Sequence, residues 1–524
     1  MAAPYVQLRR APLKGEPLTS PVVVGKDVLE LLSTAMYVDP LSIVREYVQN
    51  AADAIDSAHT RGLFEEGEAG RIDVEINPDK RELLVKDNGV GVPRADVERV
   101  LASFGASEKR GKGFRGFRGV GRLGGLGYAR ALTFRTRAVG DPEITEIHWD
   151  CRELREQLRT SGDKVHLEDV VRSVVTVRRT KDVKQAEPHF FVVRLEGVVR
   201  LWNDRLLNLE GVSDYLSQVC PLPFTEDLPF TGQIEDHLSS KLPRRVFRIH
   251  LNDASEPLRR PYVADFNVSA TKRDRFLACQ LIELPGLDGQ PAAAGWILHH
   301  NYLGAIQATP QIRGLRARVG DIQVGDSDIF VNSFPESRFN SWVVGELHVL
   351  DPRIVPNGRR DNFEQNAAYG ALINQLVPLC RDLARRCRAS SMSRSRFLRF
   401  EKSERRVKEL LRGIRLGLTD GRSLRALLRE VDHQLQQMGG TAQSALFADA
   451  VTTGLQRRLK RLMALRKRVS EGDDRAKHVL PVPAGKRRVY QEIVRLINLS
   501  APTKRVAEAM VRRIGRLMSR KARR

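Results

Sequence analysis

Residues 44–55 read VREYVQNAADAI, and the architecture of the chain can be predicted outward from them. At about 100° per residue, Glu46, Asn50 and Asp53 fall in one narrow stripe of a helix. Apolar residues cover the opposite arc: Ile43, Val44, Tyr47, Val48, Ala51, Ala54 and Ile55. The pattern predicts a buried helix with polar groups along one edge. Because Arg45, Gln49 and Asp56 flank the stripe, an ordinary amphipathic helix with a solvated face is the alternative.

A predicted hairpin follows this helix. Residues 71–77 alternate polar and apolar side chains, Pro78-Asp79-Lys80 makes a turn, and residues 82–86 lead back to Asp87. The sequence Asp87-Asn88-Gly89-Val90-Gly91 comes next, and its glycines permit positive φ and close approach of a flat ligand to the backbone. A simple loop is the alternative for this turn when it is taken without the preceding helix.

Nine glycines occur between residues 103 and 127, including the run Gly116-Phe117-Arg118-Gly119-Val120-Gly121-Arg122-Leu123-Gly124-Gly125-Leu126-Gly127. So glycine-rich a segment predicts a mobile loop whose N–H groups, with the start of a following helix, can enclose phosphates. A flexible linker is the alternative, but interleaved aromatic residues such as Phe104 and Tyr128 disfavour it. A carboxylate/amide helix, an Asp-x-Gly-x-Gly turn and a glycine-rich segment in this order predict a nucleotide site.

Length and composition indicate the number of domains and the broad class of protein. The 524 residues suffice for about three domains, and predicted strands at 131–136, 174–178 and 190–195 would complete a mixed sheet. Without a long apolar run or secretory signal, we expect a soluble, intracellular protein, cytoplasmic or nucleoid-associated, with no membrane partner. The five cysteines lack Cys-x-x-Cys spacing, so we expect reduced, partly buried thiols rather than disulfides or a zinc site.

The positive charge is concentrated in the last quarter of the chain. Residues 381–524 carry 38 Lys and Arg against 13 Asp and Glu, a net charge of +25, whereas the first 380 residues are near neutral. Apolar residues there recur at helical spacing: Val407, Leu410, Leu411, Ile414, Leu424, Leu427, Leu428, Val431, Leu435, Val451, Leu455, Leu459, Leu462 and Leu465. The surface could attract phosphate backbones without sequence specificity, or be merely solvated; sparse aromatics argue against base stacking.

Three motifs together resemble the nucleotide-binding boxes of the GHKL superfamily, which includes gyrase, heat-shock-90-type chaperones, histidine kinases and MutL. They are Arg45-Glu46-x-x-x-Asn50-Ala51-x-Asp53-Ala54, Asp87-x-Gly89-x-Gly91 and Gly119-Val120-Gly121. The first box is most similar to that of the heat-shock-90-type chaperones, and Gly116 to Gly119 has a secondary likeness to MutL and MORC proteins. The resemblance implies an α+β protein with a Bergerat-type α/β sandwich that binds ATP.

The resemblance also implies roles at the reacting end of ATP. Glu46 would be the general base that orients water toward the γ-phosphate. Asn50 would ligate Mg²⁺ through its amide oxygen, with phosphate and water completing the shell. Asp53 would support these groups through hydrogen bonds to neighbouring backbone or water. In residues 353–364, which resemble the chaperones' middle-domain loop, Arg360 would reach the γ-phosphate, with Arg359 the alternative. A surface arginine pair after a turn is the structural alternative.

At the other end of the nucleotide, the resemblance implies that Asp87 accepts a hydrogen bond from the adenine amino group, in a turn opened by Gly89 and Gly91. Backbone N–H groups of six consecutive residues would bind the terminal phosphates: Phe117, Arg118, Gly119, Val120, Gly121 and Arg122. The chain departs from the chaperone pattern twice. Arg99-Val100 aligns where an Asn is usual, and Gly-Thr is absent near His189-Phe190-Phe191. Ser107 and Lys109 are candidates to replace the nucleotide contacts of those missing residues.

The predicted order of domains is an arm (residues 1–20), a GHKL ATP-binding domain (21–204), an α/β transducer-like middle domain (205–380) and an all-α basic region (381–524). We expect an ATP-driven clamp that needs Mg²⁺, closes a lid and pairs two protomers through their amino-terminal parts. One hypothesis is a heat-shock-90-like chaperone or remodelling ATPase acting on client proteins. A second is a MORC- or MutL-like clamp on nucleic acid, bound by the basic region. A third, a scaffold that binds ATP without turnover, is disfavoured by Glu46.

Overall fold

A computed structural model describes residues 39–64, 70–102, 121–160, 167–181, 187–200, 204–242, 246–307, 311–415, 421–444, 449–470, 482–502 and 504–519. The chain divides into two compact units. The first comprises Met1–Asn301 and Ala305–Arg381, and the second comprises Tyr302–Gly304 and Asp382–Arg524.

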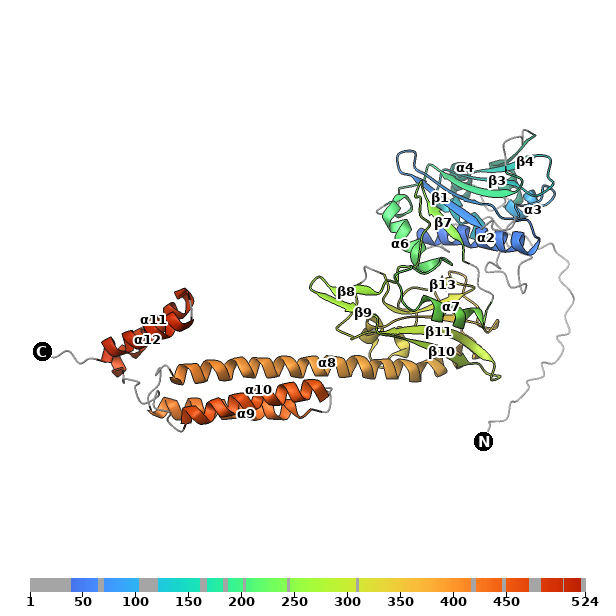
Figure 1. Ribbon diagram of the computed structural model, residues 1–524. Coiled ribbons are helices and arrows are strands. Elements are labelled where there is room, and N and C mark those ends of the chain that lie inside the picture. Colours follow the sequence, from blue (N-terminus) through green and yellow to red (C-terminus); the bar gives the residue numbers. More distant parts are fainter. Residues whose placement is uncertain are drawn as a thin grey trace. The chain divides into compact units, whose positions relative to one another are not determined.

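The first unit begins with a seven-stranded sheet in the order β5-β4-β3-β6-β2-β1-β7 (Figure 1). Its strands are β1 (Arg71–Asn77), β2 (Glu82–Asp87), β3 (Ala131–Arg137), β4 (Ile144–Asp150), β5 (Val175–Thr180), β6 (Phe190–Glu196) and β7 (Arg248–Leu251). The predicted hairpin is confirmed, since β1 and β2 pair antiparallel with Ile72 opposite Asp87. Val174 ends a helix, so the predicted strand there starts one residue later, at Val175.

Helices cover one face of this sheet. They are α2 (Leu41–Thr60), α3 (Val97–Leu101), the 3₁₀ turn η2 (Gly121–Gly127), α4 (Cys151–Thr160), α5 (Leu167–Val174), η3 (Arg205–Leu207) and α6 (Leu209–Val219). Strand alternation sends Leu83, Val85 and Asp87 of β2 toward the helices and Lys86 toward the other face. The core between helices and sheet is therefore continuous, and α2 lies at its centre (Figure 1).

A second sheet follows in the same unit, in the order β10-β11-β14-β12-β13. It consists of β10 (Ala278–Pro285), β11 (Pro291–His299), β12 (Gly314–Val319), β13 (Ile322–Val324) and β14 (Val344–Val349). The ribbon β8 (Asp265–Ser269) with β9 (Lys272–Arg275), the helix α7 (Thr231–Ser239) and the 3₁₀ turns η4 (Val331–Ser333) and η5 (Ser337–Trp342) accompany it. β7 lies beyond the predicted domain end at residue 204, yet it pairs in parallel with β1 of the first sheet.

A fully buried ionic cluster holds the connector that follows α6 against the second sheet. Glu346 of β14 accepts hydrogen bonds from Arg260 and from the Tyr262 hydroxyl, and it also contacts Arg318 Nη2 at 2.6 Å and His348 Nε2 at 3.5 Å. The guanidinium of Arg318 also donates to the Gln218 carbonyl oxygen at 2.6 Å, and Arg260 Nε donates to that of Leu222 at 2.9 Å. Because α6 packs against α2, the cluster joins the second sheet to the helix that carries the predicted site.

The second unit is mainly helical, and its described residues include no strand. Its helices are the end of α8 (Ala367–Arg415), α9 (Gly421–Ala442), α10 (Asp449–Ser470), α11 (Arg487–Ser500) and α12 (Lys504–Ser519), with the turn η6 (Ala484–Lys486). Apolar residues of α8, α9 and α10 form one core, and α11 packs with α12 around another. The predicted α+β class with a helical carboxy-terminal region is confirmed. α8 starts at Ala367, earlier than the periodicity after Arg381 indicates.

The five cysteines are thiols in the structure, as predicted. Burial raises the pKa of Cys151, Cys220, Cys380 and Cys387 to about 12. Within the described ranges, no helix is long and apolar enough to cross a membrane.

Candidate nucleotide-binding site

The predicted polar stripe of α2 lies at the edge of the core. Asp39-Pro40 precedes the first turn, where Asp39 Oδ1 accepts a hydrogen bond from the Leu41 N–H at 3.1 Å. The Glu46 side chain is 12% exposed, Asn50 is half-buried and Asp53 is 2% exposed. A helix with a solvated polar face is excluded, because Arg45 and Gln49 beside the stripe are 6% and 0% exposed. The carboxylate of Glu46 is thus a polar group on a largely buried helix.

Two guanidinium groups face Glu46. Arg360 Nε lies 3.3 Å from Glu46 Oε1, and Arg45 Nη2 lies 3.7 Å from the same oxygen. Arg45 Nη2 also donates a hydrogen bond to the carbonyl oxygen of Arg359 at 3.3 Å. On the other side, a Cβ atom at Gly121 would come within 2.5 Å of Glu46 Oε2. The carboxylate therefore lies where α2, the loop of residues 353–364 and the start of η2 meet.

Local backbone geometry explains why Arg360, rather than Arg359, faces Glu46. Pro356 and Phe363 form an isolated β-bridge, and the Asn357 N–H donates to the Asn362 carbonyl oxygen at 2.8 Å. Between them Arg360 has a left-handed φ of 55°, and its carbonyl oxygen accepts a hydrogen bond from Gly325 N–H at 2.8 Å. The turn buries the Arg360 side chain and leaves Arg359 exposed.

The Asp87 turn is fixed against α2 through its glycines. Asp87 Oδ1 accepts a hydrogen bond from the Gly89 N–H at 2.9 Å, and Val90 N–H donates to the Ala54 carbonyl oxygen at 3.2 Å. A Cβ atom on Gly89 would lie 2.6 Å from the carbonyl carbon of Ala54. Gly91 has φ +64°, and a Cβ atom there would lie 2.1 Å from the Arg137 carbonyl oxygen. Both positions thus require glycine for a close backbone approach.

Two further side chains hold this turn, and the motifs did not predict either of them. The buried ring of His189 has its Nδ1 2.8 Å from the Gly89 carbonyl oxygen. Thr136 Oγ1 accepts a hydrogen bond from Val92 N–H at 2.9 Å and donates to the Phe190 carbonyl oxygen at 3.0 Å. His189 is in the segment where the chaperone pattern has Gly-Thr, so the departure from that pattern was the available signal.

The described end of the glycine-rich segment packs against α2. Gly125 N–H donates to the hydroxyl of Tyr47 at 3.1 Å, a contact that the sequence does not indicate because the helical period places Tyr47 on the apolar arc. Arg122 Nη1 donates to the Val100 carbonyl oxygen at 2.6 Å, and burial, followed by the charge of Arg99, lowers the pKa of Arg122. The predicted residues Ser107, Lys109, Phe117, Arg118, Gly119 and Val120 lie outside the described residues.

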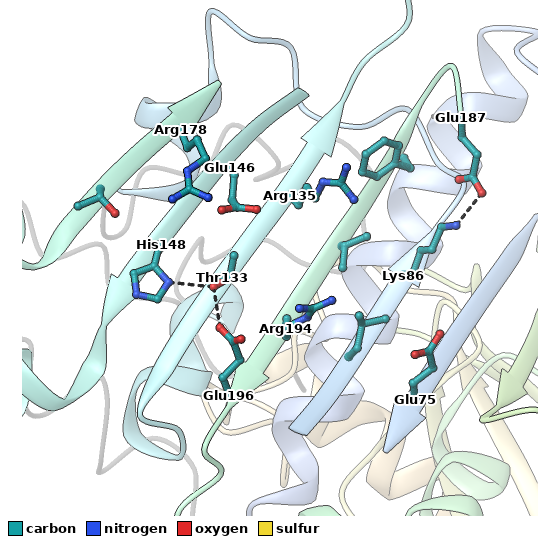
Figure 2. Close-up of a pocket in the computed structure, with 14 residues that line it drawn as sticks. Glu75, Lys86, Thr133, Arg135, Glu146, His148, Arg178, Glu187, Arg194 and Glu196 are labelled. Atoms are coloured by element: carbon teal, nitrogen blue, oxygen red, sulfur yellow. Dashed lines mark hydrogen bonds and ion pairs between the residues drawn. The ribbon is translucent and has the colours of Figure 1, made fainter. Parts of the chain in front are cut away.

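A large charged cavity of about 1120 Å³ lies on the other face of the seven-stranded sheet (Figure 2). Charged side chains from six strands and from Glu187 line it: Glu75, Lys86, Arg135, Glu146, Arg178, Glu187, Arg194 and Glu196. Their signs balance, and Lys86 pairs with Glu187 at 2.6 Å. Because Lys86 and Asp87 are consecutive on β2, their side chains point to opposite faces. This cavity is therefore separate from the predicted nucleotide site.

The candidate magnesium ligand is Asn50, a half-buried side chain whose amide oxygen is a hard donor. The described ranges contain no group of three or more His, Cys, Asp or Glu side chains that could hold a metal ion. The donor set fits a magnesium ion that takes most of its ligands from phosphate and water, which is the usual arrangement for this cation at nucleotide sites.

Comparison with known proteins supports an ATPase domain in this part of the chain. Residues 38–173 match the family model described as histidine kinase-, DNA gyrase B- and HSP90-like ATPase. A chaperone protein HtpG of Citrobacter koseri is 32% identical over 142 residues, which cover 24% of this chain and 23% of the relative. A chaperone protein HtpG of Buchnera aphidicola is 25% identical over 201 residues, covering 34% of this chain and 31% of the relative. The chain thus spans about a quarter to a third of these curated relatives, and it carries a GHKL-type ATPase domain similar to that of the heat-shock-90-type chaperones.

Proposed function

We propose that this chain is a magnesium-dependent, ATP-hydrolysing clamp that acts as a heat-shock-90-like chaperone or remodelling protein. The observation that carries the proposal is the approach of Arg360 to Glu46 at 3.3 Å. A helix at the start of the chain and a loop more than three hundred residues later thereby contribute opposite charges to one place. Such a composite site suits phosphoryl transfer, in which catalysis consists mainly of positioning and charge stabilisation.

In the proposed reaction, Glu46 orients the attacking water and accepts its proton as the water oxygen bonds to the γ-phosphorus, while the bond from that phosphorus to the β–γ bridging oxygen breaks and ADP leaves. Its position at the edge of a buried helix limits its motion, which favours a fixed hydrogen bond to that water. Arg360 then turns from Glu46 toward the γ-phosphate and stabilises the charge that develops on its oxygens. Arg360 Nε and Glu46 Oε1 lie 3.3 Å apart, which is longer than a strong hydrogen bond. Moving Arg360 away from Glu46 therefore costs less free energy than breaking an ion pair whose atoms are all at hydrogen-bonding distance.

We propose the remaining contacts with the nucleotide from the same site. Asp87 would receive the adenine amino group at the turn that Gly89 and Gly91 hold close to α2. Asn50 would bind the magnesium ion, which would screen the phosphate charges, and Asp53 would support the neighbouring groups. Backbone N–H groups from residues 117–122, with Ser107 and Lys109, would enclose the phosphates. Closure of this segment would favour amino-terminal pairing of two protomers around a client protein.

The test is the steady-state ATPase rate of the full chain and of matched variants. We expect Glu46→Ala to lower kcat by about 10²- to 10⁴-fold while retaining ATP binding, as removal of a general base does. Arg360→Ala should also lower kcat, whereas Arg359→Ala, at the exposed neighbouring position, should leave it close to the parent value. Asp87→Asn should instead weaken ATP affinity.

Three results would each contradict a part of the assignment. Unchanged turnover in Glu46→Ala would show that the general base is wrong. Equal losses in Arg359→Ala and Arg360→Ala would remove the specific role of Arg360. Unchanged ATP affinity in Asp87→Asn would place the adenine elsewhere.

A second candidate function is an ATP-gated clamp on nucleic acid of the MORC or MutL type. The net charge of +25 over residues 381–524 favours it, because so basic a region attracts phosphate backbones through counterion release. Stimulation of the ATPase rate by duplex DNA or RNA that disappears with rising salt would support this function. Stimulation by an unfolded protein alone would support the chaperone. ATP binding without turnover in the parent chain would indicate the third possibility, a scaffold.

A further inference from the structure

A groove of about 1100 Å³ lies between α8 and α9 within the second unit. Its α8 wall carries five basic side chains, and its α9 wall carries the uncharged donors Gln434, Gln437 and Thr441. The basic residues are Arg396, Arg399, Lys402, Arg405 and Arg406. We call this feature the α8–α9 groove. It opposes a row of cations to a row of hydrogen-bonding groups.

The basic side chains form a row along α8. Arg396, Arg399, Lys402 and Arg406 are spaced by three or four residues, which places them on one side of a helix. The row extends ~15 Å along the helix axis at ~1.5 Å per residue. One strand of a B-form duplex presents about four phosphates over that distance, at ~3.4 Å per phosphate along its axis.

The arrangement of acidic residues leaves this groove positive. Glu404 of α8 is bound by Arg458 of α10 and by Lys408 at 2.8 Å, and Glu401 also faces Arg458. Those carboxylates are thereby neutralised on the α10 side of α8. In the groove itself, Glu430 pairs with Arg406 at 2.7 Å, and Glu409 is the other lining carboxylate, so that five cations face two carboxylates. Among the described residues, Lys402 and Arg405 have no ion-pair partner within 4 Å, and both are exposed.

We infer that the α8–α9 groove binds the phosphodiester backbone of a nucleic-acid duplex. Its lining contains no aromatic residue among the described positions, so it offers no surface on which unpaired bases could stack. The uncharged donors of α9 can hydrogen-bond to phosphate oxygens without adding charge, as they do in backbone contacts generally. The inference deepens the second candidate function, and it does not depend on ATP hydrolysis.

The test compares two triple variants of the full chain that remove the same charge. The groove variant is Arg399→Gln, Lys402→Gln and Arg405→Gln. The control variant is Arg457→Gln, Lys460→Gln and Arg461→Gln, at exposed positions of α10 that do not line the groove. Binding is measured by fluorescence anisotropy with labelled 30-base-pair DNA and RNA duplexes across a range of salt concentrations. Circular dichroism verifies that both variants fold.

We expect the groove variant to bind duplex at least tenfold more weakly than the parent. Its slope of log affinity against log salt should become shallower by about 2 to 3, as expected when three phosphate contacts are lost. The control variant should lose less than threefold. A preference for DNA or for RNA would show which nucleic acid the groove binds, and either preference supports the inference that it binds a phosphodiester backbone.

Equal losses in the two variants would overturn the inference, because the binding would then follow diffuse charge. Poly-glutamate serves as the competing polyanion. If the groove variant loses poly-glutamate and duplex binding to the same degree, the groove accepts acidic protein, and the assignment to a phosphodiester backbone is wrong. The basal ATPase rate of the groove variant should equal that of the parent, so failure of this inference and failure of the proposed ATPase are separately visible.

Discussion

Two glutamates of the first unit each face two guanidinium groups, but they differ in how completely they are bound. Glu346 is fully buried with Arg260, Arg318 and the Tyr262 hydroxyl, all at hydrogen-bonding distance. Glu46 is 12% exposed, and its arginines lie 3.3 and 3.7 Å from one oxygen. Distances of this length are ion pairs rather than strong hydrogen bonds. The same chemical groups thus form a saturated structural cluster in one place and a loosely bound, partly accessible carboxylate in the other.

The difference explains why one glutamate can serve chemistry and the other cannot. Burial alone would raise the pKa of Glu346, but the charges of Arg260 and Arg318 outweigh it and hold that pKa well below its usual range. A carboxylate so bound has no capacity left for a water or a phosphate. The other oxygen of Glu46 faces Gly121, and only a glycine leaves that space, because a Cβ atom there would lie 2.5 Å from Oε2. Substitutions at the two sites should therefore affect different quantities.

Glu346→Gln should produce the largest loss of stability. The amide preserves the shape of the side chain but leaves Arg318 buried without its carboxylate partner, and it leaves Arg260 with Asp321 alone, at 3.4 Å. Breaking a buried ion pair in this way costs about 3–5 kcal/mol in the free energy of unfolding. Urea unfolding followed by tryptophan fluorescence measures it, since all four tryptophans belong to the first unit. Trp296 packs edge-on against Tyr262 of the cluster, at 5.0 Å between ring centroids.

The matched control is Glu46→Gln. We expect it to lower the free energy of unfolding by less than Glu346→Gln does, because the arginines of Glu46 lie 3.3 and 3.7 Å away rather than at hydrogen-bonding distance, while it abolishes most ATP turnover. If Glu346→Gln were as stable as Glu46→Gln, the contrast between a saturated and a loosely bound carboxylate would be wrong.

Gly91→Ala should give the next largest effect, and Gly62→Ala isolates its cause. Both glycines have nearly the same left-handed φ, +64° and +66°. Each alanine therefore incurs a backbone cost of about 1–2 kcal/mol. A Cβ atom at Gly62 meets nothing within 4 Å, whereas at Gly91 it would lie 2.1 Å from the Arg137 carbonyl oxygen. We expect Gly91→Ala to cost about 1–3 kcal/mol more, as overpacking does, and to weaken ATP binding at least tenfold.

Calorimetric melting and titration with a fluorescent ATP analogue measure both quantities. Equal effects of the two alanines would show that the Asp87 turn can move away from β3 and that its close packing does not define the site.

Asp274 is a third buried carboxylate, bound by hydrogen-bond donors rather than by guanidinium groups. Burial raises its pKa, but hydrogen bonds from His300 Nδ1 at 2.9 Å and Asn301 Nδ2 at 2.8 Å outweigh burial and lower that pKa to about 2. Because the pKa is lower in the folded chain than in the unfolded chain, the contribution to stability is complete above about pH 4. It is lost as the pH falls through about 2, and amounts to about 2 kcal/mol.

Urea unfolding of the parent and of Asp274→Asn between pH 5 and pH 2 measures this contribution. The difference in free energy of unfolding between the two chains should shrink by about 2 kcal/mol as the pH falls. A constant difference would show that the carboxylate is not specifically stabilised in the folded chain.

The sequence predicted those parts of the fold that local patterns determine. The α2 helix, the β1–β2 hairpin and the glycines of the Asp87 turn follow from periodicity and from the backbone freedom of glycine. Helices α4 and α5 were not predicted within residues 143–199, because each is short and lies between strands. The pairing of β7 with β1 brings together segments some 175 residues apart, and no local pattern indicates it.

In the candidate site, too, the sequence predicted only those residues that a local pattern brings together. Glu46, Asn50 and Asp53 could be predicted because one helix repeat places them together. His189 and Thr136 could not, because their partners are backbone groups of the Asp87 turn, which carry no sequence signature. Glu346 likewise shows no motif, since its partners Arg260 and Tyr262 precede it by more than eighty residues. Residue type alone does not separate the proposed catalytic glutamate, Glu46, from the structural one, Glu346; their partners do.

Gln49 offers the smallest test of this comparison, because it is a buried polar group on α2 that is bound less well than either glutamate. Its side chain is 0% exposed, and neither amide atom has a hydrogen-bond partner among the described residues. An unpaired buried amide costs about 1–3 kcal/mol, and leucine has a similar volume without that penalty. We expect Gln49→Leu to raise the free energy of unfolding by about 1 kcal/mol without changing ATP affinity.

Gln218→Leu is the matched control for this last prediction, since it removes an amide that is bonded at both ends. Gln218 Oε1 accepts from Arg316 at 3.0 Å, and its Nε2 donates to the Asp214 carbonyl oxygen at 2.7 Å. That substitution should lower stability, because it leaves the buried Arg316 with fewer acceptors. Melting temperatures of the two variants should therefore move in opposite directions. If Gln49→Leu lowers the melting temperature as Gln218→Leu does, the Gln49 amide stabilises the fold through a partner beyond the described residues, and the predicted gain is wrong.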